Sequence, residues 1–405
     1  MMEGGEVESD TMDVETGAQE IFMPEMPIYL DYNATTPIDP RVARAMEPYL
    51  HGHFGNPSSA HPYGIEARRA VEKARRQVAG LLGCQPAEIV FTSGGTESNN
   101  TAIRGAAGAL RARRAHIITS AVEHPAVLEP CHYLERQGFR LTVLPVDECG
   151  RVDPAEVAAA ITDETILVSI MHANNEVGTI QPIEEIAALA HERGVLVHSD
   201  AAQSVGKIHV RVDRLGVDLL SLAGHKFYAP KGVGALYIRS GVALERLLYG
   251  AGHEAGRRPG TENVLEIVGL GQAAEIAAAD LDMNTAHMRD LRERLWRGLQ
   301  EGLADPEGLR LNGHPEQRLP NTLSLGFRGV QANTLLAKIA DRVAASAGAA
   351  CHAAGVDVSS VLQAMGVPLD YAMGTVRFSV GKMSTAAEID RAVQVVVETL
   401  RTSGE

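Results

Sequence analysis

Short apolar runs alternate with amphipathic stretches along the middle of the chain, from about residue 115 to residue 238. The runs are rich in β-branched side chains and show little polar alternation, which is typical of strands buried on both faces of a sheet. The stretches between them have one polar face and the length of a helix. Strands that alternate with helices indicate βαβ units, so we expect an α/β fold with a mostly parallel sheet covered by helices. The predicted strands cover residues 116–119, 140–143, 166–170, 195–198 and 218–221.

The pattern changes beyond about residue 284 and predicts a smaller C-terminal α/β domain. Its expected elements are a charged helix at 288–301, a strand at 321–325, a helix near Leu335 and a final helix from Ala386. We therefore expect a large domain at 27–283 and a small domain at 284–405. The first residues of the large domain, 27–36, are expected to pack on the small one.

Small residues dominate segment 345–358 of the expected small domain. Such side chains contribute little burial energy, and Gly348 and Gly355 add backbone freedom. The segment is predicted to be a mobile loop rather than a packed element. Ser359 follows it as the expected N-cap of a helix at 361–365.

Charge and hydropathy exclude two classes of function. The 405 residues carry 37 Lys and Arg against 51 Asp and Glu, a formal net charge of −14. Eight of these acids and no base stand within residues 1–26, which predicts an acidic disordered tail. No run reaches the ~18 apolar residues of a spanning helix, and no Lys/Arg stripe suits a phosphate backbone. We expect neither a membrane protein nor a nucleic-acid partner.

The four cysteines stand at irregular positions, Cys84, Cys131, Cys149 and Cys351. They form neither a disulfide framework nor a CxxC metal pair. The amino end shows no signal-peptide or transit-peptide pattern, so a cytoplasmic location is expected. The 15 histidines show no ligand spacing beside a cysteine or an acid, and no metal site is expected.

Three polar signals follow predicted strands in a definite order. A glycine-rich segment, 93–98, precedes a helical stretch, so its backbone N–H groups could hold a phosphate. Asp200 ends one buried strand, and Lys226 follows the next one. Each alone could be a strand-to-helix turn, a surface aspartate or a solvated lysine. Together they supply what pyridoxal 5′-phosphate requires: a phosphate anchor, a carboxylate for the pyridine nitrogen and an amine for the Schiff base.

Ten segments resemble the class V aminotransferase-like enzymes and, within them, the cysteine desulfurases and selenocysteine lyases. The resemblance runs from about residue 28 to residue 390 and implies a fold-type I pyridoxal-phosphate-dependent transferase. The segments cover residues 29–37, 55–59, 91–99, 123–124, 172–178, 198–203, 224–226, 258–261, 348–352 and 377–379.

The resemblance implies roles for residues around the cofactor ring. Lys226 resembles the lysine that forms the Schiff base, Asp200 the partner of the ring nitrogen, and Gln203 the partner of the phenolic oxygen. His124 resembles the imidazole that stacks on the ring and assists proton transfer, and Asn175 is similar to the residue beside the phenolic oxygen and the substrate.

The resemblance also implies a set of phosphate ligands. Gly95, Thr96 and His225 match them within one chain, and Thr261 matches a residue that reaches in from a second subunit. That last match implies a homodimer. Many desulfurases have a serine where this chain has Ala223, so one hydrogen bond to the phosphate is expected to be missing.

For the substrate, Arg377 corresponds to the arginine that binds the carboxylate, assisted by Asn33 and Asn175. Cys351 corresponds to the loop cysteine whose thiolate takes sulfur from cysteine as a persulfide, leaving alanine. The implied activity is cysteine desulfurase, with L-cysteine as substrate and a sulfur-acceptor protein, as in iron–sulfur cluster assembly, as a further partner.

Three alternatives remain open at this point. The loop sequence Gly-Ala-Ala-Cys-His and the sequence Gly-His-Lys-Phe-Tyr look more like the selenocysteine lyases, which release selenium and alanine. A non-catalytic scaffold that holds pyridoxal phosphate and carries sulfur is a second alternative. An aminotransferase is the third, although it would leave Cys351 without a role.

Overall fold

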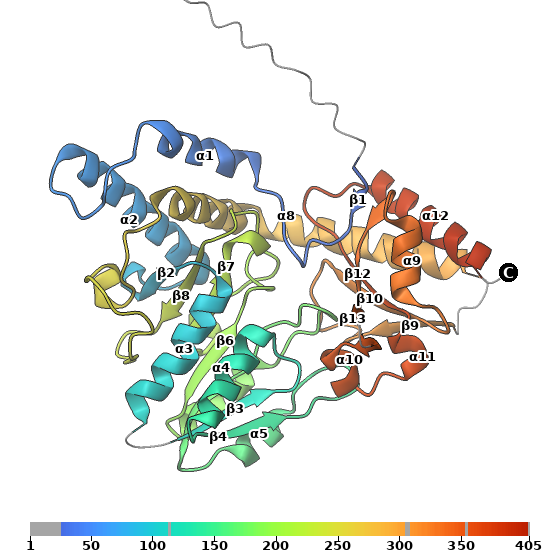
Figure 1. Cartoon of the computed structure of the whole chain (residues 1–405), viewed down its shortest axis with the longest axis horizontal. Helices are drawn as coiled ribbons and strands as arrows, with labels where there is room; N and C mark the ends of the chain where they lie inside the picture. The colour runs from blue at the N-terminus through green and yellow to red at the C-terminus, as the bar shows by residue number, and fades with distance from the viewer. Residues whose placement is uncertain (1–25, 112–114, 304–307, 353–354, 404–405) are drawn as a thin grey trace, which may run out of the picture.

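The larger part of the fold is built on a seven-stranded sheet (Figure 1). The computed structural model describes residues 26–111, 115–303, 308–352 and 355–403, without the side chains of 349–357. The acidic tail predicted at 1–26 therefore lies outside the described residues, except for Met26. The strands run in the order β2-β8-β7-β6-β5-β3-β4, and only β8 is antiparallel to its neighbours. The predicted, mostly parallel sheet is thus confirmed. Its strands are β2 (Ile89–Thr92), β3 (His116–Ser120), β4 (Arg140–Leu144), β5 (Thr165–Ser169), β6 (Leu196–Asp200), β7 (Leu219–Ala223) and β8 (Gly234–Ile238).

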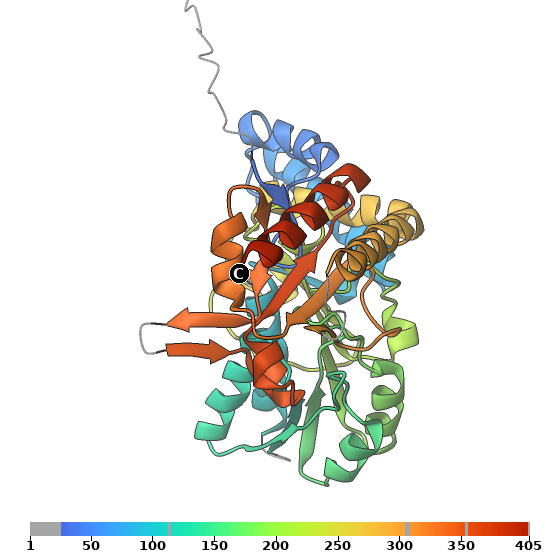
Figure 2. The ribbon, with the colours of Figure 1, turned by 90° about the vertical axis from the view of Figure 1, so that its right-hand side faces the viewer.

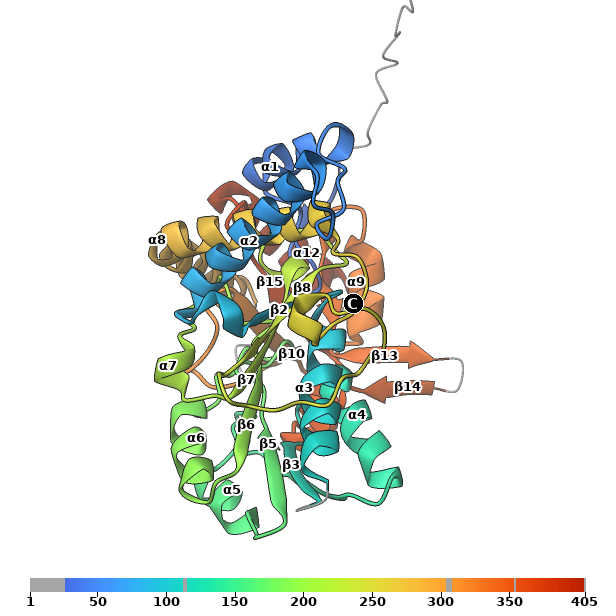
Figure 3. The ribbon, with the colours of Figure 1, turned by 90° about the vertical axis from the view of Figure 1, so that its left-hand side faces the viewer.

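Helices cover both faces of this sheet, which Figure 3 shows from the side. One face packs on α3 (Gly95–Leu110) and α4 (Pro125–Arg136) through one apolar cluster. The other face packs, through a larger apolar cluster, on helices from several parts of the chain. Burial on both sides explains why the central strands lack polar alternation. The second set consists of α1 (Pro40–His51), α2 (Pro62–Leu82), α5 (Pro154–Ala160), α6 (Ile183–Glu192), α7 (Val212–Leu215) and the start of α8 (Val264–Gly302).

Helix α8 is much longer than the sequence predicted. The charged pattern predicted a helix over 288–301, whereas α8 runs continuously for 39 residues. Its first half is rich in Ala and Gly rather than charge, because it packs closely on other helices. A Cβ added to Gly271 would lie 2.5 Å from the Cα of Ala74 in α2. The boundary that we propose between domains, at 283/284, falls inside this helix.

The smaller part has its own four-stranded antiparallel sheet and its own apolar core. The strand order is β12-β15-β10-β9. Near the amino end of the described chain, β1 (Ile28–Tyr29) pairs in parallel with β11 (Val343–Ala344), and Leu30 lies in this second core. The remaining elements are β9 (Leu309–Asn312), β10 (Thr322–Phe327), α9 (Ala332–Ile339), β12 (Ser346–Ala347), α10 (Ser360–Ala364), α11 (Leu369–Ala372), β15 (Thr375–Ser379) and α12 (Ala386–Ser403).

Most of the described residues of segment 345–358, for which the sequence predicted a mobile loop, lie in short strands. After β12 come β13 (Ala349–His352) and β14 (Gly355–Val358), which pair as an antiparallel hairpin. Figure 2 shows the hairpin projecting from the body of the molecule. Pairing between the backbones of the two strands satisfies N–H and C=O groups, and this contribution does not depend on the size of the side chains. The predicted cap is confirmed, because Ser359 accepts a hydrogen bond from Val361 N at the start of α10.

Among the described residues, no helix combines the length and the apolar character needed to cross a bilayer.

Candidate active site

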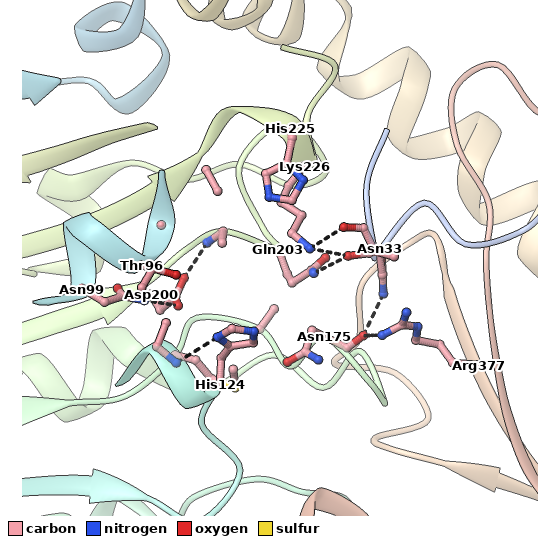
Figure 4. A pocket seen from close by; sticks show the side chains of 17 residues that line it. Asn33, Thr96, Asn99, His124, Asn175, Asp200, Gln203, His225, Lys226 and Arg377 are labelled. Atoms are coloured by element: carbon pink, nitrogen blue, oxygen red, sulfur yellow. Dashed lines mark hydrogen bonds between the residues drawn. The ribbon is translucent and has the colours of Figure 1, made fainter. Parts of the chain in front are cut away.

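A cavity of about 340 Å³ opens at the carboxyl ends of the parallel strands, between the two sheets (Figure 4). Ligand sites in open α/β sheets occur at this edge. Of the predicted cofactor and substrate residues, all but Thr261 line it. They are Asn33, Gly95, Thr96, His124, Asn175, Asp200, Gln203, His225, Lys226 and Arg377.

One end of the cavity is formed by the first turn of α3. The turn before it requires glycine, because Gly94 has φ = 148°. The backbone of β8 also approaches closely here, since a Cβ on Gly234 would lie 2.7 Å from the Cα of Gly94. Gly95 and Thr96 stand in the first helical turn, where N–H groups have no partner within the helix. This end of the cavity is suited to a phosphate.

Asp200, the last residue of β6, is buried at the cavity wall with 7% of its surface exposed. Its Oδ2 accepts a hydrogen bond from Asn99 Nδ2 at 2.7 Å, and its Oδ1 accepts one from Ala202 N at 2.9 Å. The sequence analysis did not identify Asn99. Its position four residues after Gly95 in α3 could have indicated that it faces the same cavity.

Lys226 reaches the cavity from a short turn after β7. Its Nζ donates hydrogen bonds to two backbone carbonyl oxygens, Asn33 O at 2.7 Å and Ala34 O at 2.8 Å. Burial, reinforced by the charge of Arg377, lowers the pKa of Lys226 to about 8, against the opposing effects of Asp200 and Asp31. An amine with such a pKa is partly neutral near pH 7, and the neutral form is the nucleophile.

His124 is the N-cap of α4, and its Nδ1 accepts a hydrogen bond from Ala126 N at 3.1 Å. That contact leaves the opposite side of the ring for the cavity. Burial and the charge of Lys226 lower the pKa of His124, while Asp200 opposes the change. The imidazole is therefore held mainly in its neutral form.

The residue before it, Glu123, is another group that the sequence analysis missed. Its carboxyl group is 3% exposed and accepts hydrogen bonds from Ser120 Oγ at 2.6 Å and from Met171 N at 2.9 Å. These contacts join the end of β3 to the segment that follows β5. Burial raises the pKa of Glu123 to about 8.

Arg377 lies on β15 of the smaller sheet, and its guanidinium group reaches the cavity. Its Nη2 donates to Asp31 Oδ1 at 2.7 Å and to Ser346 Oγ at 3.0 Å, and its Nη1 donates to Asn175 O at 3.1 Å. Three acceptors fix the plane of the group, which suits it to recognise a carboxylate. Asp31 and Ser346 were not predicted, and they connect Arg377 to the strand that leads into the hairpin.

Of the two remaining predicted residues, one lies away from the cavity and the other cannot be placed from the described side chains. Thr261 is exposed on the segment before α8 and does not line it. The backbone of Cys351 lies in β13, but its side chain is outside the described part of the structure. The other cysteines are free, and burial raises the pKa of Cys84 and of Cys131 to about 12. Within the described residues, no group of three or more His, Cys, Asp or Glu side chains is placed to hold a metal ion.

Known proteins of one family are similar to this chain in sequence and in fold. Cysteine desulfurase IscS of Dictyoglomus turgidum is 47% identical over 379 residues, which cover 93% of this chain and 95% of that protein. A solved NifS-like protein matches with a TM-score of 0.87 at 41% identity, over 93% of this chain and 100% of that one. A structure described as SspA in complex with cysteine matches with a TM-score of 0.77 at 36% identity, over 88% and 99% of the two chains. Since residues 28–392 match the model of the class V aminotransferases, the chain belongs to that family.

Proposed function

We propose that this protein is a pyridoxal-phosphate-dependent cysteine desulfurase, which converts L-cysteine to L-alanine and transfers the sulfur to Cys351. One observation carries the proposal: Lys226, Asp200 and Arg377 line a single cavity that ends at the amino end of α3. An amine, an acid, a guanidinium group and a phosphate cradle are the groups that this cofactor and an amino acid substrate need together.

The donor set of the cavity fits the cofactor. Gly95, Thr96 and His225 would hold its phosphate, and Lys226 would bond covalently to its aldehyde carbon. Asp200 would pair with the ring nitrogen, since Asn99 and Ala202 N already orient its carboxylate. Gln203 and His124 would contact the phenolic oxygen and the ring face. The volume of about 340 Å³ lies within the range of sites for such ligands.

Different residues of the chain bind the substrate and transfer its protons. When bound, the cofactor accepts the electron pair left on Cα after its proton is removed, which weakens the bond from Cβ to sulfur. Arg377 binds the substrate carboxylate, with Asn33 holding Asn175 in place through Nδ2 at 3.1 Å from Asn175 O. Lys226, once displaced by the substrate amine, is the base for the Cα proton, because its lowered pKa leaves a larger neutral fraction near pH 7 than an ordinary lysine has. His124 moves protons at the ring face and at the sulfur.

Sulfur transfer is the proposed role of Cys351. Its thiolate attacks the substrate sulfur, so that an S–S bond forms as the bond from Cβ to sulfur breaks. Cβ takes up a proton, and Cα regains the proton that Lys226 had removed. The products are alanine and an enzyme persulfide, which balances without an external oxidant. Placement on a projecting hairpin would let the persulfide meet a sulfur-acceptor protein, our further proposal for a partner.

Two further proposals concern the assembly and its location. We propose a homodimer in which Thr261, exposed in the single chain, completes the phosphate site of the other subunit. We also propose that the enzyme acts in the cytoplasm. Sedimentation of the purified protein tests the first, and cell fractionation tests the second.

Incubation with cysteine tests the central proposal. The purified protein loaded with cofactor should produce one alanine per sulfur released, and the peptide with residue 351 should gain the mass of one sulfur atom. A protein that binds the cofactor but forms no alanine would instead be the non-catalytic scaffold. Turnover confined to selenocysteine, and retained in Cys351→Ala, would support the lyase alternative, which the curated relative reported above does not favour.

A further inference from the structure

Lys207 is a buried lysine next to the proposed cofactor site for which the proposed mechanism has no role. It lies on the turn after β6, seven residues beyond Asp200, and is 4% exposed. Its Nζ donates hydrogen bonds to Gln203 Oε1 at 2.7 Å and to Asn33 Oδ1 at 3.0 Å. Both partners line the cavity, whereas Lys207 stands behind them.

A lysine can fix the orientation of two amides because it has N–H donors to offer to both. Nζ donates to both side-chain amides, so both turn their oxygen atoms toward it, as a charged amine with donors and no acceptor requires. The hydrogen bonds of the two amide nitrogens agree with this orientation. Gln203 Nε2 donates to Asn33 O at 2.9 Å, and Asn33 Nδ2 donates to Asn175 O at 3.1 Å and to Thr322 Oγ1 at 2.8 Å.

The surroundings of Lys207 differ from those of an ordinary structural ion pair. The partners of its Nζ are amide oxygens rather than a carboxylate. Burial, together with the charges of Lys226 and Arg377, lowers the pKa of Lys207 well below its usual range. A buried amine without an acid partner costs stability. That cost is consistent with a function in positioning rather than in folding.

We propose that Lys207 is a positioning residue for the cofactor, because it holds the Gln203 amide with its N–H side toward the cavity. One of the two Nε2 hydrogens goes to Asn33 O, which also accepts from Lys226 Nζ at 2.7 Å. The second hydrogen is left for an oxygen atom in the cavity. This inference rests on the proposed function, which puts the phenolic oxygen of pyridoxal phosphate beside Gln203.

The pH dependence of the visible absorption of the holoenzyme tests the proposal. The absorption band of the Schiff base between Lys226 and the cofactor shifts when the Schiff base loses its proton. A hydrogen-bond donor at the phenolic oxygen stabilises the deprotonated Schiff base. Loss of that donor therefore raises the pH at the midpoint of the spectral change. The other titratable or charged groups are Asp200, His124, His225 and Arg377 in the cavity lining and Asp31, which pairs with Arg377. They stay the same in every variant and cancel in the comparison.

Lys207→Met removes the donors, and Lys207→Gln restores N–H groups without charge. We expect the midpoint to rise by about half a pH unit or more in the Met variant and to recover at least half of that shift in the Gln variant. Lys73→Met, at an exposed position on α2, is the matched control and should keep the wild-type midpoint. Lys207→Ala serves as the donor-free variant if the Met variant does not fold.

The outcomes separate this inference from the proposed function. An unchanged midpoint in the donor-free variant would overturn the inference, while the visible band itself would still support the proposed function. Equal shifts in the Met and Gln variants would also overturn it, because charge rather than amide orientation would then be the cause. A wild-type protein that takes up pyridoxal phosphate without a visible band would overturn the proposed function and this inference with it.

Discussion

Glu123→Gln should change how the free energy of unfolding depends on pH. Burial raises the pKa of the wild-type carboxyl group to about 8 in the folded protein, from the usual 4.5 of a glutamate in water. An acid whose pKa is raised by folding keeps its proton in the folded state after the unfolded chain has lost it. Stability therefore falls as pH rises from about 4.5 to about 8, and it stays level above that range.

The size of the effect follows from the width of this window. Each pH unit in which only the unfolded state has lost the proton lowers the free energy of unfolding by about 1.4 kcal/mol. Between pH 6 and pH 8 the wild-type protein should therefore lose about 2 kcal/mol relative to a neutral side chain, since Glu123 is about half ionised at the upper limit. Glutamine provides that neutral side chain, and its amide oxygen can still accept from Ser120 Oγ and Met171 N, as Glu123 Oε1 does.

Urea unfolding of the cofactor-free protein at several pH values is the assay. The difference in free energy of unfolding between Glu123→Gln and wild type should increase in favour of the variant from pH 6 to pH 8. Glu129→Gln, an exposed carboxylate on α4, is the control and should follow the wild-type profile. Parallel profiles for wild type and Glu123→Gln would show that the carboxyl group titrates normally, which would refute the reasoning from burial.

Three other substitutions test the cavity. Lys226→Ala should leave the fold intact and abolish both turnover and the covalent attachment of cofactor that borohydride makes permanent, and retained turnover would contradict its role. Asn99→Leu removes a charge-assisted hydrogen bond to Asp200 worth about 1.5–3 kcal/mol, so the dissociation constant of the cofactor, measured by equilibrium titration, should rise roughly 10- to 100-fold. Arg377→Lys cannot keep three fixed acceptors, so the KM for cysteine should rise roughly tenfold or more, with little change in cofactor affinity; an unchanged KM would argue against carboxylate binding.

The sequence predicted the central sheet well because its strands are buried on both faces and leave a strong apolar pattern. The strands at 116–119, 140–143 and 218–221 differ from β3, β4 and β7 by one or two residues at their ends. Helix α8 was predicted too short because close packing on α2 selects Ala and Gly, which hide the usual amphipathic pattern. The hairpin was missed because pairing of backbone groups leaves little signal in side chains as small as these.

The meeting of Asp200 and Lys226 at one cavity was predictable, because each follows a predicted strand of a parallel sheet. Residues that act by contacting other residues of the site were not predictable from the sequence. Asn99, Glu123 and Lys207 contact their partners across sequence separations of 101, 48 and 174 residues, in the bonds to Asp200, Met171 and Asn33. Only the fold brings such pairs together, so no local motif identifies the contacts, and the spacing of Asn99 from Gly95 indicates only a shared helix face.

The continuous course of α8 limits how this enzyme can admit and release small molecules. At about 1.5 Å per residue, its 39 residues form a rod of roughly 58 Å that is shared by both cores. A clamshell closure of one sheet onto the other would have to bend this rod, so the walls of the reaction chamber keep a nearly constant spacing. We therefore expect small molecules to enter and leave the cavity through movements of short segments around it rather than through rotation of whole domains.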